Sequence, residues 1–113
     1  MTRRAGTAAE DLALAHLQQR GLALEARNFA CRMGEIELIM EERGTLVFVE
    51  VRQRSSTAFG GAAESITARK REKLVATARY YLARRPDLPP CRFDAVLVDG
   101  QGRIDWIRDA FRE

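Results

Sequence analysis

The segment from Thr45 to Arg52 constrains the fold more than any other part of this chain. Every residue between Thr45 and Glu50 is apolar, and most are β-branched or aromatic. Such residues favour a β-strand, and a strand that is apolar on both faces usually lies in the middle of a sheet that is covered on both sides. The sequence therefore predicts a central strand over 45–52, with other elements packed against both faces of its sheet.

Further elements are predicted on either side of this strand. A helix over 7–20 has Thr7 and Glu10 at the spacing of a capping box and Gly21 where a left-handed C-terminal cap is needed. The others are strands over 22–30 and 35–41, a hairpin turn at Arg43-Gly44, a Ser- and Gly-rich loop over 53–63, a helix over 65–84, and strands over 92–99 and 103–108. We therefore expect one α/β domain over residues 1–113, a mixed five-stranded sheet flanked by helices, in the order α-β-β-β-α-β-β.

Composition excludes several other classes of protein. A length of 113 residues suits one domain, and 46% hydrophobic with 31% charged residues is typical of a folded chain. No apolar run reaches membrane-spanning length or forms a secretory leader, so a cytoplasmic protein is expected. Cys31 and Cys91 are then expected to be free thiols, with a disulfide disfavoured. Zinc is disfavoured because the one histidine, His16, has no Cys or His at ligand spacing.

Glu50 and Arg52 lie two residues apart on the predicted central strand, so their side chains leave the same face. Leu46 and Phe48 precede them on that face and are expected to be buried. Charged groups that continue a buried stripe are costly to desolvate unless they are paired or bind something. Two interpretations fit equally well: an ion pair within one strand, and a binding site.

Glu37 lies on the preceding strand, on the face opposite Ile36, Leu38 and Met40. If that face joins the face of Glu50, two carboxylates converge at one end of the sheet, where they repel unless a proton or a cation lies between them. Hard oxygen ligands of this kind suit Mg²⁺ or Mn²⁺ rather than zinc. The alternative is a solvated acidic strand face.

Glu10 supplies a third candidate ligand. It precedes Ala13, Leu14 and Leu17 by three, four and seven residues, which places it on the apolar stripe of the first helix and directs it toward the sheet. The helix dipole favours a negative charge at this end. The alternative is that Glu10 serves only the capping box with Thr7.

Basic residues cluster at the start of the second helix, where the dipole disfavours cations. The net charge of +3 is weak evidence for nucleic-acid binding by itself, but a helix selected for stability alone would carry acids here. Phosphate binding is the favoured interpretation, and a solvated charged face partly offset by Glu72 is the alternative. The four residues are Arg69, Lys70, Arg71 and Lys73.

Several segments, in order along nearly the whole chain, closely resemble the bacterial YraN-like family of uncharacterised proteins. They are Gly34-Glu35-Ile36-Glu37-Leu38-Ile39, Val47-Phe48-Val49-Glu50-Val51-Arg52-Gln53-Arg54, Phe59-Gly60, Lys70, Arg92-Phe93-Asp94 and Trp106-Ile107-Arg108-Asp109-Ala110-Phe111. The resemblance implies a restriction-endonuclease-like fold close to the archaeal Holliday-junction resolvases, with a PD-(D/E)xK site.

Carried over residue by residue, that site takes Glu37 as its first acid, Glu50 as the glutamate of Glu-x-Lys, and Glu10 as the helix glutamate. This chain departs from the pattern twice, with Glu37 where Asp is usual and Arg52 where Lys is usual. The extra methylene moves the carboxylate by roughly 1.5 Å, which would shift or weaken a metal. Arginine stays protonated, so it can stabilise negative charge but cannot accept a proton.

The implied activity is hydrolysis of DNA phosphodiester bonds, with branched DNA as the substrate. Mg²⁺ or Mn²⁺ would be bound by Glu37, Glu50 and the main-chain carbonyl of Val51, with Glu10 acting through water. Arg52 would stabilise the charge that develops on the phosphate.

The DNA backbone would be held by basic side chains, and the loop over 53–63 would close over the substrate. Two other hypotheses are open: a nucleic-acid-binding module whose catalytic site has decayed, and a non-catalytic interaction subunit that docks an acidic partner. A homodimer is expected by analogy with junction resolvases, which cut symmetrically. The residues assigned to nucleic-acid binding are Arg54, Arg69, Lys70, Arg71 and Lys73.

Overall fold

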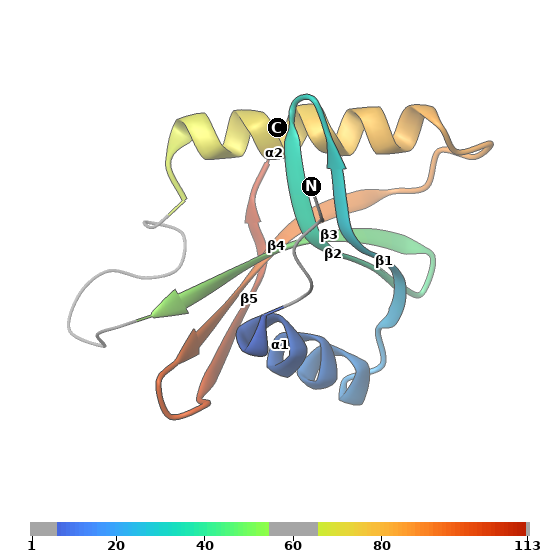
Figure 1. Ribbon diagram of the computed structural model, residues 1–113. Helices are drawn as coiled ribbons and strands as arrows, with labels where there is room; N and C mark the ends of the chain where they lie inside the picture. Colours follow the sequence, from blue (N-terminus) through green and yellow to red (C-terminus); the bar gives the residue numbers. More distant parts are fainter. Residues whose placement is uncertain (1–6, 55–65, 113) are drawn as a thin grey trace.

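The computed structural model describes residues 7–54 and 66–112, and it contains two helices and five strands (Figure 1). In chain order they are α1 (Ala8–Gln19), β1 (Ala23–Cys31), β2 (Gly34–Glu42), β3 (Thr45–Arg54), α2 (Ala68–Ala83), β4 (Cys91–Asp99) and β5 (Ile104–Phe111). The predicted order of elements is confirmed. Gln53 and Arg54, which were predicted to belong to a loop over 53–63, belong to β3 instead. The rest of that loop, with Phe59-Gly60, lies outside the described residues.

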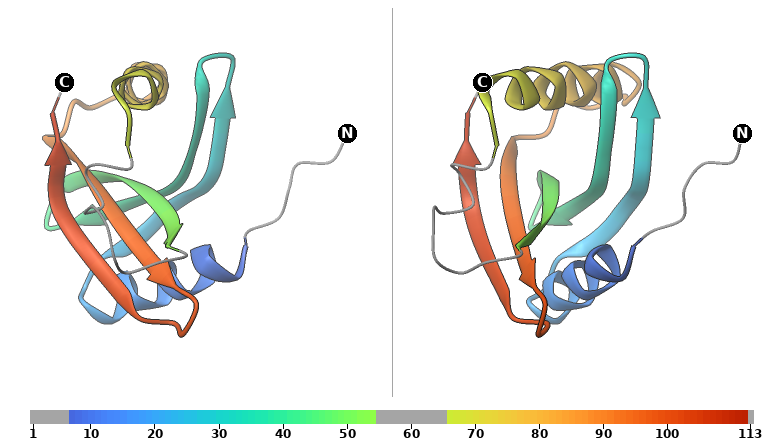
Figure 2. Two further views of the ribbon diagram at one scale, coloured as in Figure 1. Left: turned by 90° about the vertical axis from the view of Figure 1, so that its left-hand side faces the viewer. Right: turned by 60° about the vertical axis from the view of Figure 1, so that its left-hand side comes forward.

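The strands form one mixed sheet in the order β1-β2-β3-β4-β5. All neighbours are antiparallel except β3 and β4, which are parallel. Two parallel strands need a long crossover connection. The connection from β3 to β4 contains α2. Figure 2 shows α1 and α2 on opposite sides of the sheet. The expected five-stranded mixed sheet flanked by helices is thus confirmed, with β3 at its centre.

The side chains of β3 alternate between two hydrophobic clusters. Leu46 and Phe48 are buried in the cluster on the α2 side, together with Leu74 of that helix. Val47 and Val49 are buried in the cluster on the α1 side. A strand that supplies both clusters must be apolar on both faces, which accounts for the unbroken apolar run in its sequence.

Two local features follow the sequence closely. The capping box at the start of α1 is present, since Thr7 and Glu10 exchange hydrogen bonds between side chain and main chain, and Gly21 after the helix has a φ of 98°. The turn between β2 and β3 places Arg43 and Gly44 at φ values of 51° and 87°. Two consecutive positive φ values are typical of the turns that match the twist of a hairpin.

The faces of β2 differ from the prediction. Ile36 packs in the cluster on the α2 side, whereas Leu38 and Met40 pack in the cluster on the α1 side. The prediction that these three residues share one face was therefore wrong. The change occurs beside Asn28 of β1, whose φ of 55° is left-handed and interrupts regular strand geometry. At this point the side chains of β2 that face α2 and those that face α1 change places, so the β1–β2 pair is twisted about its own length.

The pair formed by β4 and β5 is held by a buried carboxylate. Asp94 of β4 is 0% exposed. It accepts hydrogen bonds from Nε and Nη2 of Arg92 at 2.9 and 3.1 Å, from Nε1 of Trp106 at 2.9 Å, and from the backbone N–H of Asp109 at 2.9 Å. These contacts tie the end of β5 to the sheet, and the strand runs beyond the predicted limit of Arg108.

Cys31 and Cys91 are half-buried, and they are not joined by a disulfide. Neither of the two described helices combines the length and the apolar character that crossing a membrane would require.

Candidate metal centre and nucleic-acid site

The candidate site lies where β2 and β3 separate. Their pairing ends at Leu38 and Val49. Beyond this point Oε1 of Glu37 accepts a hydrogen bond from the backbone N–H of Val51 at 2.9 Å. A buried N–H needs a partner, and here a side chain of β2 replaces the main chain of β2. The carboxyl group of Glu37 is thereby fixed against the edge of β3.

Glu37 and Glu50 line one pocket of about 170 Å³ between β2, β3 and α2. Lys70 and Lys73 reach the same pocket from α2, and Glu35 borders it from β2. The structure thus brings the carboxylates of two neighbouring strands together, and it places two ammonium groups beside them. Carboxylates can ligate a cation, and ammonium groups can bind a phosphate.

The pKa values of the two carboxyl groups are both raised above the ordinary value. Burial raises the pKa of Glu37 to about 8, and the negative charge of Glu50 adds to this rise, while the N–H of Val51 opposes it. Burial also raises the pKa of Glu50, against the positive charges of Arg52 and Lys70. At pH 7 the pair therefore retains a proton that exposed carboxyl groups would release. A divalent cation offsets the same repulsion, and its binding would release that proton.

Arg52 forms the ion pair that the strand spacing suggested. Its Nη1 donates to Oε2 of Glu50 at 3.3 Å, and 29% of the Arg52 side chain is exposed. The guanidinium group therefore lies at the border of the site with part of its surface in solvent. Such a position allows contact with an anion that binds next to Glu50.

Glu10 is held mainly by its own helix. It is 2% exposed, its Oε1 accepts from the backbone N–H of Thr7 at 3.3 Å, and it lies 3.8 Å from Nη2 of Arg27. Its charge raises the pKa of Glu37, so the two groups interact, yet Glu10 does not line the pocket that holds Glu37 and Glu50. The capping role is therefore observed.

Side chains alone do not complete a metal site in this structure. Across residues 7–54 and 66–112, no three His, Cys, Asp or Glu side chains are grouped so that they could hold a metal ion. A main-chain oxygen is a further source of ligands. The N–H and C=O of one strand residue point to the same side, so the carbonyl of Val51 faces the same space as its N–H, which meets Glu37. Two carboxylates and this carbonyl are hard oxygen donors that fit Mg²⁺ or Mn²⁺.

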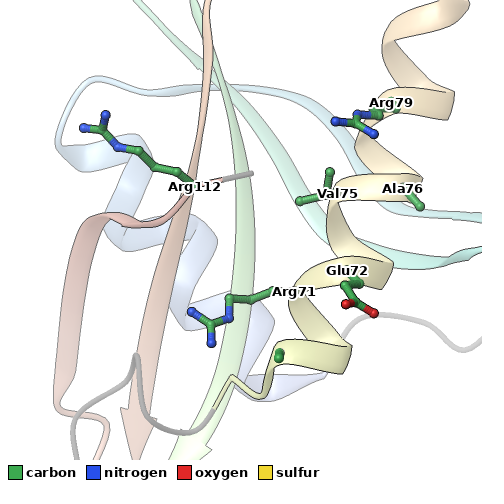
Figure 3. A pocket seen from close by; sticks show the side chains of 7 residues that line it. Arg71, Glu72, Val75, Ala76, Arg79 and Arg112 are labelled. Carbon is green, nitrogen blue, oxygen red and sulfur yellow. The ribbon is translucent and has the colours of Figure 1, made fainter.

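The basic cluster of α2 divides between two sides of the helix. Lys70 and Lys73 line the acidic pocket, whereas Arg71 lines a separate pocket of about 450 Å³ with Arg79 and Arg112 (Figure 3). Helical spacing accounts for this division, because residues three or four apart lie on one side of a helix. Arg69 is exposed. The side chain of Arg54, at the end of β3, lies outside what the structure describes.

Sequence reasoning missed Asn28. This residue is 9% exposed and lies across the β1–β2 pair from Glu37. Its Oδ1 is buried and has no hydrogen-bond partner within the described part of the chain. An asparagine inside a strand was the available signal, because asparagine is depleted in strands and tolerates left-handed conformations.

Comparison with known proteins shows to which family the chain belongs. A family model described as uncharacterised protein family UPF0102 matches residues 9–98. The chain belongs to this family. A UPF0102 protein of Nitrosomonas europaea is 57% identical over 110 residues, which cover 96% of this chain and 93% of the relative. A UPF0102 protein of Paracidovorax citrulli is 59% identical over 114 aligned positions, 97% of this chain and 84% of the relative. The UPF0102 protein of Nitrosomonas eutropha is 52% identical over 112 positions, 99% and 97% of the two chains.

These matches confirm the resemblance to the YraN-like family. The segments that carry it serve different purposes in this UPF0102 protein. Glu37 and Glu50 lie in the acidic pocket, while Asp94 and Trp106 hydrogen-bond to each other and hold the sheet together. Gly34 permits a close approach of two elements, because a Cβ at this position would lie 3.1 Å from Oγ1 of Thr77 on α2.

Proposed function

We propose that this UPF0102 protein is a divalent-metal-dependent nuclease with a restriction-endonuclease-like fold that cleaves DNA phosphodiester bonds. The observation that carries the proposal is the convergence of Glu37 and Glu50, a half-buried and a buried carboxyl group with raised pKa values, beside Lys70 and Lys73. Perturbed carboxyl groups in a pocket are typical of functional sites. The order of elements and the YraN-like segments support the fold assignment, and Mg²⁺ or Mn²⁺ is the cofactor that these oxygen donors suit.

The chain's own groups would divide the work as follows. Glu37, Glu50 and the carbonyl of Val51 would hold the cation, with Glu10 joining through a water molecule. When bound, the cation supplies an activated water and polarises the phosphate. In hydrolysis a water oxygen bonds to phosphorus, one P–O ester bond breaks, and a proton is transferred to the departing oxygen.

Cationic side chains would handle the phosphate. The guanidinium group of an arginine is a cation and not a proton acceptor in proteins, so Arg52 would stabilise negative charge on the reacting phosphate. Lys70 and Lys73 would bind a neighbouring phosphate of the backbone. Arg71 points into a different pocket, so with Arg69 it would contact DNA farther from the reacting bond, as would Arg54.

Branched DNA as the substrate and a homodimer belong to the same proposal and rest on the likeness to junction resolvases. A cytoplasmic location is proposed with them because no apolar run of the sequence reaches membrane-spanning length. A dimer with two sites would cut two strands symmetrically. Light scattering of the purified chain that gives the mass of a monomer at working concentration would argue against this part of the proposal.

The test is cleavage of end-labelled DNA by the purified full chain. A synthetic four-way junction, a matching duplex and single-stranded DNA are incubated with Mn²⁺, with Mg²⁺ or with EDTA. The native protein is expected to cut with metal and not with EDTA, and Glu50→Gln is expected to lose at least a hundredfold in rate. Glu41→Gln is the matched control, because Glu41 is an exposed glutamate of β2. Equal cutting by Glu50→Gln would reject the assigned site.

A second function is supported by the Arg52–Glu50 ion pair at 3.3 Å. A glutamate that is ion-paired within its own strand, next to a residue that cannot accept a proton, suits a nucleic-acid-binding module that no longer cleaves. This candidate predicts DNA binding that weakens with salt and does not depend on metal. Restoring the usual residues with Glu37→Asp and Arg52→Lys would then produce cleavage where the native chain has none.

A further inference from the structure

Asn28 lies in the middle of β1, across from Glu37. The pairing of β1 with β2 continues on both sides of this position and skips it. The backbone of Asn28 is left-handed there, with a φ of 55°. The residues on either side of it pair directly, Arg27 with Leu38 and Phe29 with Ile36, so Asn28 falls opposite Glu37 in the register.

The chain neighbours of Asn28 reach different layers of the molecule. Arg27 forms an ion pair with a carboxylate of α1, and Phe29 packs edge-on against Tyr81 of α2 with ring centroids 5.0 Å apart. In a regular strand these two neighbours would share a face. The strand therefore turns over at Asn28, the residue that falls opposite Glu37 in the register of β1 and β2.

The carboxamide of Asn28 is left with an unsatisfied oxygen. The residue is 9% exposed, and its Oδ1 is buried without a hydrogen-bond partner in the described part of the chain. Native proteins rarely keep such an atom unless it meets water, an ion or a ligand. The backbone conformation does not require the group, because glycine adopts a positive φ without a side chain.

We propose that Oδ1 of Asn28 is a ligand for the divalent cation held by Glu37 and Glu50. This inference rests on the proposed function and extends its ligand set to β1. An amide oxygen is a hard, neutral donor that Mg²⁺ and Mn²⁺ accept. Asparagine suits the position better than aspartate, because the negative charges of Glu50, Glu10 and Glu35 already raise the pKa of Glu37 and a further charge would add repulsion.

The experiment measures Mn²⁺ binding to the full chain by isothermal titration calorimetry, and the melting temperature in EDTA. Asn28→Gly keeps the left-handed backbone and removes the oxygen, so its Kd for Mn²⁺ is expected to rise about tenfold or more, with a melting temperature equal to or above that of the native chain. Asn28→Asp keeps an oxygen in place, so its Kd is expected to match or fall below the native value. Its melting temperature in EDTA is expected to be lower, and Mn²⁺ should restore it.

Three outcomes would overturn the inference. If Asn28→Gly binds Mn²⁺ with the native Kd while Glu50→Gln does not bind, Asn28 has only a conformational role and the proposed function stands. If Asn28→Asp binds as weakly as Asn28→Gly, an oxygen at this position does not ligate the ion. If the native chain binds neither Mn²⁺ nor Mg²⁺, both the inference and the proposed nuclease are rejected.

Discussion

Asp94 is a fully buried carboxyl group and Glu37 is a half-buried one, and their surroundings differ. Asp94 accepts hydrogen bonds from Arg92, from Trp106 and from the main chain of β5. Glu37 has one main-chain donor, and it faces the negative charge of Glu50 in a pocket that raises its pKa to about 8. The first group is neutralised within the protein, whereas the second is held beside a like charge.

This difference distinguishes a carboxyl group that supports the fold from one that is placed to bind a ligand. A fully satisfied buried network fixes the packing of a core, while groups whose charges conflict lower stability and are retained where they bind something. Both regions belong to segments that resemble the YraN-like family, so the resemblance alone does not distinguish them. The hydrogen bonds and the electrostatics do.

Removing the charge of Asp94 should therefore destabilise the fold. Asp94→Asn leaves Arg92, whose side chain is 19% exposed, with a neutral partner, and it disturbs the donors of β5. We expect a loss of about 3 kcal/mol in the free energy of unfolding, measured by urea denaturation at pH 7. Glu41→Gln, at an exposed position on β2, is the control and should change the value by less than about 0.5 kcal/mol. A loss below about 1 kcal/mol at Asp94 would show that its network is not a main support of the sheet.

Removing the charge of Glu37 should have the opposite effect in metal-free buffer. Its folded pKa of about 8 lies above the ordinary value of 4.5, so the unfolded chain releases this proton between about pH 4.5 and 8 while the folded chain keeps it. The contribution of Glu37 to the free energy of unfolding of the native chain therefore falls as pH rises through this range. Glu37→Gln keeps an acceptor for the N–H of Val51 and abolishes the fall, so we expect a gain on the order of 2 kcal/mol at pH 8 in EDTA.

The measurement is urea denaturation at pH 5 and pH 8, with Glu41→Gln as the control on the same strand. The gain from Glu37→Gln should be larger at pH 8 than at pH 5, and the variant should not cleave DNA. A loss of stability at pH 8 would mean that the Glu37 carboxylate is well solvated or well paired in the folded chain, and that the contrast with Asp94 is wrong.

Much of the fold could be predicted from the sequence, because its signals are local. The apolar run through Phe48 predicts the central strand, Thr7 and Glu10 predict the start of α1, and Arg43-Gly44 predicts the hairpin turn. The orientation of Ile36 could not be predicted, since it depends on how two paired strands turn over.

The site was predictable only in part, for similar reasons. The strand spacing of Glu50 and the resemblance at Glu37 brought forward the two carboxylates that share a pocket. Helical spacing also separates Lys70 and Lys73 from Arg71, a division that the clustering of the basic residues does not show by itself. The contacts of Asp94 join residues 12 and 15 positions away, and no local pattern reports contacts of that range.

The hydrogen-bond network around Asp94 continues through Arg92 to Glu42. The contribution of Glu42 to stability depends on pH in the opposite sense to that of Glu37. Hydrogen bonds from Arg108 at 2.9 and 3.1 Å, together with Arg92 at 2.9 Å, lower the pKa of Glu42 to about 2. The unfolded chain takes up this proton below about pH 4.5, and the folded chain resists it until about pH 2. The stabilising contribution of Glu42 is therefore present above pH 4.5 and is lost as pH falls toward 2.

Glu42→Gln removes this contribution. Because 51% of the Arg108 side chain is exposed and solvent screens the pair, we expect a loss of only about 1 kcal/mol at pH 7. The difference between native and variant in urea denaturation should shrink at pH 3, and Glu41→Gln should show no such trend. A difference that grows toward low pH would mean that the Glu42 carboxyl is protonated more easily in the folded chain than in the unfolded one. Arg92 and Arg108 would then not stabilise the Glu42 carboxylate, and Glu42 would not belong to the hydrogen-bond network around Asp94.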